Sequence, residues 1–566
     1  MMNQLYIFLT TSILLLACAG NSHVDATEKT NYLQNLEDDN NISYDKIVNT
    51  RASYITSMCY TKTKSERTGR ISNPCYSCHT RGEIPNYYND TNLQSEYNFP
   101  DEIMKNPYSN LFKDRRENVQ KISDKTILAY IRESNYMDAK GSLILADTLP
   151  QSWKGYRPDC YFNFDGEGFD KDNEGEYTLW RAFRYYPFLG TFWPTNGSTD
   201  DVMIRLNSVF SQDNKGNFDL DVYKLNLSIV ESLVKSKDVN LSVAVNEHEY
   251  GVDLNQNGVL DMTKQIVVSR YDKMSYVGKA KESLLKGKVH LALGLYPEGT
   301  EFLHSVRYID WDSSKNSIKM SQRMKELRYA KKYVWKTYSE RERIASSELQ
   351  ESLALGNNKA VMATFRGTYE EGLKNETGWV YQGFIEDKKG DLRPQTHEET
   401  INCMGCHSHL GTTTDSIFSY TRKFEGTDKN SHDYGWNHWS QKNMSGIKEP
   451  RVSYKNHGEQ YEYSFYLHNN HSGNEFRDND EVHEKFFGLD ENLDEKMIQK
   501  LHDDISILLF PSYERALSLN KTYKVLVEEQ SFIYGRNVNT VPRLNVFQEI
   551  EEEQSTNILS VIVRGK

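Results

Sequence analysis

The segments Cys75-Tyr76-Ser77-Cys78-His79 and Cys403-Met404-Gly405-Cys406-His407 each carry two cysteines separated by two residues, with a histidine directly after the second cysteine. At this spacing two thiols reach the two vinyl groups of one porphyrin and form thioethers with them. The histidine that follows offers an imidazole nitrogen to the iron. Two complete copies predict two haem c groups. The predicted attachment residues are Cys75, Cys78, Cys403 and Cys406, and the predicted proximal iron ligands are His79 and His407.

Two other chemistries use closely spaced cysteines. A thioredoxin-type dithiol occupies a strand-to-helix turn, and neither segment shows the pattern of such a turn. Zinc ribbons place their cysteine pairs about 15–20 residues apart, whereas Cys78 and Cys403 lie far apart in the chain. Haem attachment therefore explains the two segments better than either alternative.

The first residues predict export. Leu5–Ala17 form a mostly apolar run that is too short to span a bilayer and has the length of a signal-peptide core. Leu15-Leu16-Ala17-Cys18 resembles the lipobox of bacterial lipoproteins, although no Lys or Arg precedes the apolar run. We expect residues 1–17 to be a signal peptide, Cys18 to be lipidated and residues 18–49 to form a polar tether. Without acylation, cleavage nearby would leave a soluble exported protein.

A wider resemblance is carried by Asn73–Thr80, Gly190–Thr199, Leu392–Thr396, Asn402–His407 and Val525–Gly535. With these stretches the chain is similar to dihaem c-type cytochromes, and it resembles an uncharacterised family of bacterial cytochrome c lipoproteins. The resemblance implies electron transfer through two haems, a redox partner protein, and a lipid anchor on the periplasmic or cell-surface side of a bacterial membrane. Dihaem cytochrome c peroxidases are similar in haem content, although this chain is longer and its motifs are farther apart. A dihaem oxidoreductase, either a peroxidase or a small-molecule reductase, is the alternative.

Two cysteines remain after the lipobox and the two haem segments are assigned, Cys59 and Cys160. In an oxidising compartment, a disulfide between them would use every remaining thiol. Two buried free thiols are the alternative, because the sequence does not supply the geometry that a disulfide needs.

The sixth ligand of each iron decides between an electron carrier and a catalyst, because an open position lets a substrate bind. For the first haem, Met137 lies at a separation from His79 that suits a small cytochrome domain. For the second haem, His438 and Met444 lie in a segment rich in imidazoles and aromatic rings that could enclose a porphyrin. These three are the candidate distal ligands, and core packing is the alternative role of each methionine.

An acidic segment from Asn163 to Glu174 has the carboxylate spacing, the sixth-position glycine and the final glutamate of an EF-hand loop. Its candidate calcium ligands are Asn163, Asp165, Glu167 and Glu174. A second partial match begins at Asp253, but Lys264 stands where the final carboxylate belongs. Short polar side chains in such segments also form plain turns with their own backbone, which is the alternative.

The net charge of the chain limits the kinds of partner that it can bind. A formal net charge of −12 argues against nucleic acid, because phosphate binding needs a basic surface. An acidic surface suits weak, transient docking to a positively charged redox protein. With 26% charged and 37% hydrophobic residues, the chain has the composition of a globular protein.

The pattern along the chain predicts an α+β protein in which helical, cytochrome-c-like haem regions flank a β-rich middle. We place the first haem region at residues 50–150, the β-rich region at 151–345 and the second haem region, with C-terminal helices, at 346–566. Within the middle region, residues 222–229 alternate in polarity as a strand does. Residues 316–356 are heavily charged and favour a solvated helix.

Overall fold

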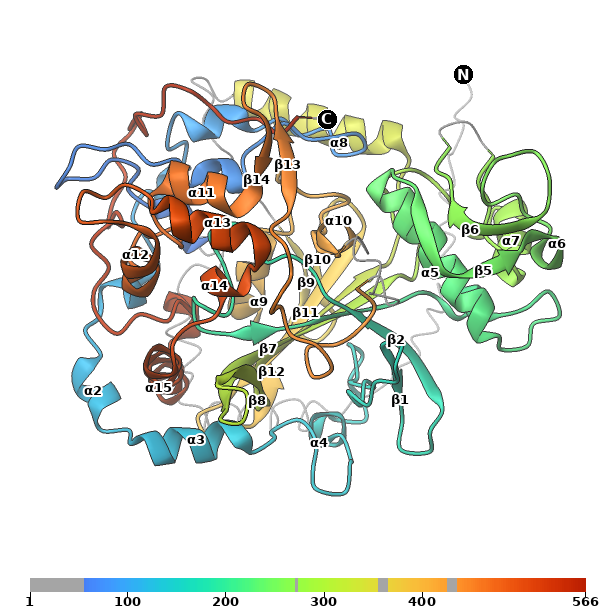
Figure 1. Cartoon of the computed structure of the whole chain (residues 1–566), viewed down its shortest axis with the longest axis horizontal. Coiled ribbons are helices and arrows are strands. Elements are labelled where there is room, and N and C mark those ends of the chain that lie inside the picture. Colours follow the sequence, from blue (N-terminus) through green and yellow to red (C-terminus); the bar gives the residue numbers. More distant parts are fainter. Residues whose placement is uncertain (1–54, 270–272, 355–364, 425–434, 566) are drawn as a thin grey trace, which may run out of the picture.

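The computed structural model describes residues 55–269, 273–354, 365–424 and 435–565 (Figure 1). The predicted signal peptide, Cys18 and the predicted tether lie outside these residues. Strands form a central sheet and helices surround it, so the protein mixes α and β structure. Within the described residues, no helix combines the length and the apolar character needed to cross a bilayer.

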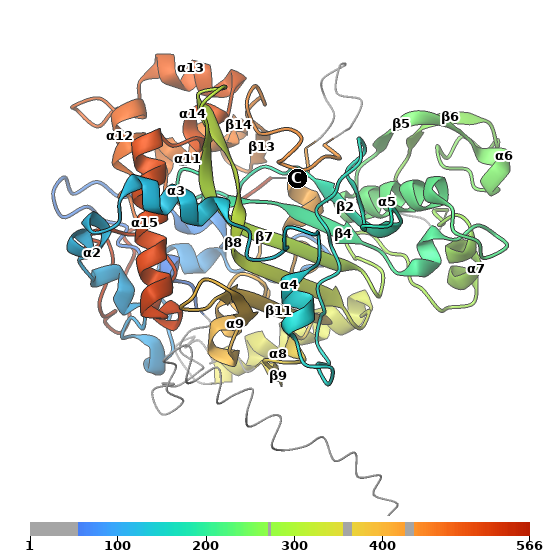
Figure 2. The same cartoon turned by 90° about the horizontal axis from the view of Figure 1, so that it is seen from below.

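The central sheet has ten antiparallel strands (Figures 1 and 2). In sheet order the main strands are β1 (Phe169–Lys171), β2 (Tyr177–Phe183), β4 (Val202–Arg205), β7 (Glu301–Asp312), β8 (Ser317–Lys332), β11 (Trp379–Glu386), β10 (Gly372–Lys374) and β9 (Arg366–Thr368). Two further strands join from the side, β3 (Thr199–Asp200) on β7 and β12 (Leu392–Pro394) on β11. The long hairpin of β7 and β8 forms the middle of the sheet.

The segment predicted as one charged helix over 316–356 is a strand followed by a helix. β8 comes first, and α8 (Tyr338–Ala354) follows it. Lys325 and Glu326 on β8 are buried, and the Lys325 ammonium donates to the Gly197 carbonyl at 2.6 Å. The prediction was wrong over β8 because partners in the fold, not solvent, satisfy these charges.

Residues 222–229, predicted as a strand, lie inside helix α5 (Leu220–Lys235). The Asp219 carboxylate caps this helix by accepting from two backbone N–H groups of its first turn. Most side chains of α5 are buried, including the polar Asn226, Glu231 and Ser232, so no exposed polar face reveals the helical period. The prediction was wrong for that reason.

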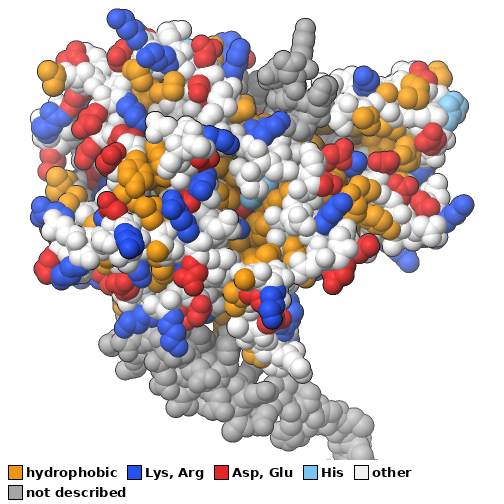
Figure 3. All heavy atoms as spheres, turned by 60° about the horizontal axis from the view of Figure 1, so that its bottom comes forward, with side chains coloured by type: hydrophobic (Ala, Val, Ile, Leu, Met, Phe, Trp, Pro, Cys, Tyr) orange, Lys and Arg blue, Asp and Glu red, His pale blue; other side chains and the backbone are white. Residues whose placement is uncertain are grey.

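A smaller lobe projects beside the sheet at the right of Figure 1. It contains α5, α6 (Glu247–Tyr250), α7 (Lys279–Leu285) and the paired strands β5 (Val239–Asn246) and β6 (Met262–Ile266). On the face shown in Figure 3, acidic and basic side chains are interspersed, and apolar side chains gather in the hollow between this lobe and the main body.

The other helices surround the remaining parts of the sheet. They are α2 (Arg116–Gln120), α3 (Asp124–Arg132), α4 (Ile144–Thr148), α9 (His397–Met404), α10 (Ser419–Arg422), α11 (Glu462–Asn470), α12 (Asp480–Phe486), α13 (Glu495–Asp503), α14 (Ser506–Leu509) and α15 (Tyr513–Glu529). A short hairpin of β13 (Arg451–Tyr454) and β14 (Gly458–Tyr461) lies among them. α3 and α15 pack on each other and on β7, while α9 packs on β10 and β11.

The predicted first haem region, residues 50–150, has its α-helices, α2, α3 and α4, only in its second half. Between residue 55 and α2, the described chain contains short 3-10 turns and no α-helix. Its backbone forms bridges to the end of the chain, pairing Thr61 with Val546 and Lys105 with Glu549. Residues 61–105 and 546–555 therefore build one region together.

The predicted boundary at residue 345 divides the sheet. Strands β1 to β8 and helices α5 to α7 all lie before this point. However, β9 to β12 follow it, and β11 pairs with β8 from Trp379 opposite Lys332 to Ile385 opposite Glu326. The sheet thus combines the two regions that the sequence pattern separates.

Candidate functional site

The first C-x-x-C-H segment forms a tight turn. Cys75–Ser77 is a 3-10 helix, and the His79 backbone N–H donates to the Cys75 carbonyl at 2.9 Å. The Asn73 side chain accepts from the Tyr76 N–H at 3.3 Å and holds the start of the turn. Such a turn brings two thiols and the following imidazole together on one short piece of backbone.

Asp90 orients the ring of His79. The Nδ1 atom of His79 lies 3.2 Å from Oδ2 of Asp90. With Nδ1 engaged, Nε2 is the nitrogen left to bind a metal, which is how ligating histidines and their outer partners are usually arranged. Burial opposes protonation of this ring, but Asp90 and Cys59 outweigh burial and raise the pKa of His79 to about 10.

The second segment begins in the last turn of α9. A capping box of Thr396 and Glu399 starts this helix, and the His407 N–H donates to the Cys403 carbonyl at 3.1 Å as the chain leaves it. The Nδ1 atom of His407 lies 2.9 Å from the Ser416 carbonyl oxygen, so Nε2 is again the nitrogen left for a metal. Burial lowers the pKa of His407 to about 4.

The loops that carry the two segments pack directly against each other. The Thr412 N–H donates to the Cys78 carbonyl at 3.3 Å. Asp90, which orients His79, also accepts from the Gly411 N–H at 3.2 Å. The Asn86 amide donates to backbone carbonyls of the second loop. The fold therefore places two segments that are distant in sequence side by side.

A buried ion-pair cluster anchors the second loop. The Asp415 carboxylate lies 2.7 Å from the Lys332 ammonium and 2.8 Å from the Arg341 guanidinium. All three side chains are buried. Because the next residue, Ser416, supplies the carbonyl that orients His407, this anchor fixes the position of the His407 ring.

A cavity of about 400 Å³ opens beside the second segment, and Cys403, Cys406 and His407 line it. Its floor is one face of the central sheet, because registered residues on β7, β8 and β11 point to the same side. These floor residues are Phe302, His304, Arg328, Ala330 and Tyr381. The volume lies in the range of about 300–1,000 Å³ that small-molecule and cofactor pockets occupy.

Several polar atoms around this cavity are buried without a hydrogen-bond partner. They are the hydroxyl of Tyr523, Nε of Arg536, Nε of Arg543 and Oε2 of Glu475. An unpaired buried group of this kind is unfavourable unless a ligand satisfies it. Guanidinium groups bind carboxylates well, and a haem carries two propionates. The open Nε donors of Arg536 and Arg543 therefore suit the propionates of a haem, whereas the Glu475 carboxylate does not.

The floor of the cavity carries an imidazole beside a guanidinium. His304 and Arg328 are direct partners in the register of β7 and β8. The His304 Nε2 lies 3.6 Å from Oδ2 of Asp200, and its ring stacks on Trp193 with centroids 6.0 Å apart. Burial, aided by Arg328, lowers the pKa of His304 to about 4, and burial raises the pKa of Asp200 to about 8.

The sequence reasoning missed His304, and no motif signals it. A single histidine within an alternating strand has the pattern of any half-buried position. Only the pairing of β7 with β8 and the return of α9 to the sheet bring it to the same cavity as Cys403.

Comparison with known proteins identifies the family. A family model with the description "-like lipoprotein" matches residues 45–506. An uncharacterised lipoprotein of Aquifex aeolicus (strain VF5) is 34% identical over 522 residues, which cover 85% of this chain and 84% of that protein. The chain belongs to this lipoprotein family. No solved structure matches it. Membership makes the protein an exported, lipid-anchored one.

The three predicted distal ligands do not line the cavity of the lipoprotein. Both ring nitrogens of His438 are engaged, Nε2 at 2.9 Å from the Asp201 carboxylate and Nδ1 at 2.9 Å from the Ser440 hydroxyl. Met444 is fully buried in a hydrophobic cluster, and Met137 packs in a different cluster from the first haem segment. The structure therefore does not bring His438 or Met444 to the cavity beside the second segment, because spacing along the chain does not say which side chains face a cavity. The sixth ligand of each iron stays a prediction.

Cys59 and Cys160 of the lipoprotein are both free thiols, so the predicted disulfide is absent. Cys59 lies beside the first segment, where it acts on the pKa of Cys75 and of His79. Cys160 is fully buried in another part of the core. Counting thiols led to the wrong pairing because it carries no information on where the fold places them.

The predicted calcium loop of the lipoprotein is a hairpin turn. The Asp165 carboxylate accepts from the backbone N–H groups of Glu167 and Phe169, where β1 begins. The Asn163 N–H donates to another carboxylate of this hairpin, Asp170. Among the described residues, Asp165, Glu167 and Glu174 do not converge on one point. The structure therefore does not bring the four predicted ligands together, and the turn explains the acidic pattern.

Proposed function

We propose that this lipoprotein is a dihaem c-type cytochrome that transfers electrons through two covalently attached haems. The observation that carries the proposal is the direct packing of the two C-x-x-C-H loops. The Thr412 N–H donates to the Cys78 carbonyl, and the Gly411 N–H donates to the Asp90 carboxylate. Attachment on adjoining loops favours electron exchange between the two haems. Two turns without a shared function would not need to pack against each other in this way.

Each C-x-x-C-H segment would hold one haem. Cys75 and Cys78 would bind one haem and Cys403 and Cys406 the other, with Nε2 of each following histidine as proximal ligand. A bound haem supplies the redox chemistry, while the chain orients the imidazoles and excludes water. The carboxylate partner of His79 makes that ring a stronger donor than His407, whose partner is a carbonyl. We infer a lower reduction potential for the first haem.

A shared zinc site is the competing use of the four thiols. Thiolates around one zinc ion would lie about 4 Å from one another, given Zn–S bonds of about 2.3 Å. Within the part of the chain that the structure describes, these thiols do not form such a group. Thioether attachment uses the four sulfurs without requiring them to converge.

We also propose how the protein is attached to the membrane. Cys18 would carry the lipid, and residues 18–49 would hold the described part of the chain away from the membrane. A redox protein on the same side of the membrane would supply or accept electrons.

Expression of the full chain with a cytochrome c maturation system tests the proposal. We expect protein that stays coloured after acid–acetone extraction and that exceeds the apoprotein mass by two haems. The paired variants Cys75→Ala with Cys78→Ala, and Cys403→Ala with Cys406→Ala, should each lose one haem and keep the other. Colourless protein of apoprotein mass would overturn the proposal.

A dihaem oxidoreductase is the second candidate, and one observation favours it. The neutral His304 ring and the Arg328 guanidinium face the cavity beside the second segment. An imidazole can take up or release a proton, and a guanidinium can stabilise negative charge on a small substrate. Electron paramagnetic resonance of the resting protein tests this candidate. A high-spin component that responds to cyanide, and that changes in His304→Gln but not in the matched variant His290→Gln, would support an enzyme. Two low-spin irons whose spectra do not change with cyanide would exclude the oxidoreductase.

A further inference from the structure

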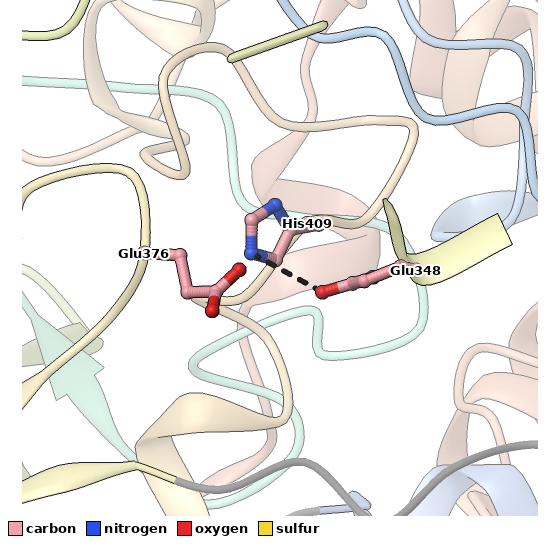
Figure 4. Close-up of side chains that lie close together, drawn as sticks. All are labelled: Glu348, Glu376 and His409. Atoms are coloured by element: carbon pink, nitrogen blue, oxygen red, sulfur yellow. Dashed lines mark ion pairs between the residues drawn. The ribbon is translucent and has the colours of Figure 1, made fainter. Parts of the chain in front are cut away.

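Three metal-binding side chains from distant parts of the chain converge beside the second loop (Figure 4). Glu348 belongs to α8, Glu376 lies in the turn between β10 and β11, and His409 follows the second C-x-x-C-H segment. One ligand atom of each lies within 4.8 Å of the other two. Within the described residues, this is the group of His, Cys, Asp and Glu side chains whose geometry suits one ion.

The distances between these ligand atoms suit atoms that bind one ion better than atoms that share a hydrogen bond. The Nε2 atom of His409 lies 3.8 Å from Oε1 of Glu348, which is longer than a hydrogen bond. Two ligands on one transition ion, each at about 2.0–2.2 Å, lie roughly 3–4 Å apart. No hydrogen bond to either ring nitrogen of His409 occurs within the described residues. The imidazole and the carboxylates therefore face a common point, where His409 and Glu348 form a long ion pair (Figure 4).

The imidazole is held in place for this role. The side chain of His409 is only 12% exposed, and its ring packs on Tyr88 with centroids 4.4 Å apart. Tyr88 comes from the segment that follows the first C-x-x-C-H motif, so the junction of the two loops fixes the ring. A ring fixed by packing loses little freedom when it binds an ion.

The turn that carries Glu376 is equally well ordered. The Asn375 side chain accepts from the Trp379 N–H at 2.9 Å and donates to the His407 carbonyl at 3.0 Å. The turn is thus tied both to β11 and to the second segment. Within the described residues, no Lys or Arg forms an ion pair with Glu376, so its charge is not neutralised by a fixed cation.

We propose that Glu348, Glu376 and His409 bind one divalent first-row transition ion. Mixed imidazole and carboxylate ligands suit such ions, and two carboxylates with one neutral imidazole would balance the charge of a divalent cation. Water would complete the coordination at the exposed side. The ion would join α8, the β10–β11 turn and the second loop, and so brace the segment that holds His407. The site does not depend on haem attachment.

Titration of Zn²⁺ into the metal-depleted full-length protein, followed by calorimetry, tests the site. We expect one saturable equivalent of Zn²⁺ in the wild-type protein. Glu376→Gln removes one ligand at an exposed position that does not support the core, and His409→Ala removes the imidazole. Each should weaken this binding at least about 10-fold.

The matched control is Glu342→Gln, which changes a carboxylate on the same helix outside the cluster and should bind Zn²⁺ as the wild type does. Circular dichroism of each variant checks that the fold is retained. The absence of a saturable equivalent in the wild type would overturn the proposal. Equal affinity in Glu376→Gln and the wild type would do the same, because Glu376→Gln leaves the core untouched.

Discussion

At the scale of single residues, the histidines of the two C-x-x-C-H segments differ in the group that holds them. A carboxylate, Asp90, accepts from His79, whereas a backbone carbonyl accepts from His407. Both arrangements leave Nε2 for a metal, but they give the rings different donor strength. The sequence identifies both histidines from the motif alone. It does not reveal their partners, because these lie in loops that only the fold brings near.

We expect Asp90→Asn to raise the reduction potential of the first haem, because the neutral amide makes the His79 ring a weaker donor. A rise of roughly 30–60 mV is the expected size, since 59 mV corresponds to about 1.4 kcal/mol for one electron. Spectroscopic redox titration measures it, and the second haem serves as the internal control. An unchanged or lower potential of the first haem would contradict the inference.

A second prediction concerns Asp200 on the cavity wall. Burial raises its pKa to about 8, so the folded protein keeps a proton that the unfolded chain releases above about pH 4. Its stabilising contribution is therefore complete below about pH 4 and is lost as pH rises through about 8. Relative to Asp200→Asn, the wild type should lose up to about 1.4 kcal/mol of stability per pH unit in this window. Urea unfolding at several pH values measures the difference, and parallel curves would show that Asp200 is ionised in the folded protein.

At the scale of elements, the second loop depends on β8 and α8. Lys332 and Arg341 reach the buried Asp415 from these two elements. This dependence explains why the charged stretch from 316 to 356 was misjudged from its sequence. A pattern of charges predicts a solvated helix when no partner is known, but here partners distant in sequence make a buried strand favourable.

Lys332→Met should destabilise the protein by about 3 kcal/mol, because it leaves the buried Asp415 with one cation instead of two. The matched control is Lys331→Met, which removes a half-exposed ammonium from the neighbouring position of β8 and should cost under about 1 kcal/mol. The midpoint of urea unfolding compares the two. Equal midpoints would mean that Arg341 alone is sufficient for the anchor.

The junction between the two loops makes a further prediction. A Cβ atom on Gly411 would lie 1.9 Å from the Thr80 carbonyl oxygen, so Gly411→Ala must push the loops apart. We expect a loss of about 1–3 kcal/mol of stability. Gly166→Ala is the control, because a Cβ there meets no atom within 4 Å. If the two variants unfold at the same midpoint, the loops are not packed as described.

At the scale of the whole molecule, the regions that the sequence pattern separates are joined. Strands before and after residue 345 share one sheet, and residues 61–105 form bridges to residues 546–555. We therefore expect residues 151–345, expressed alone, to aggregate, because the edge of β8 that pairs with β11 would be exposed. Size-exclusion chromatography against the full chain measures this. A monodisperse, folded fragment would instead show that residues 151–345 form a domain of their own, as the sequence pattern predicts.

The sequence by itself determined the local chemistry: the thiols, the imidazole beside each pair, the lipobox and much of the β-rich middle. These features lie within a few residues of one another, where spacing and composition carry the information. Only the tertiary structure decided which groups meet across long separations. It paired Asp90 with His79, placed His304 and Cys403 at one cavity, left Cys59 and Cys160 as separate thiols and brought Glu348 to His409. Such contacts depend on strand pairing and on the burial of charge by distant partners, and neither is encoded in any single stretch of the chain.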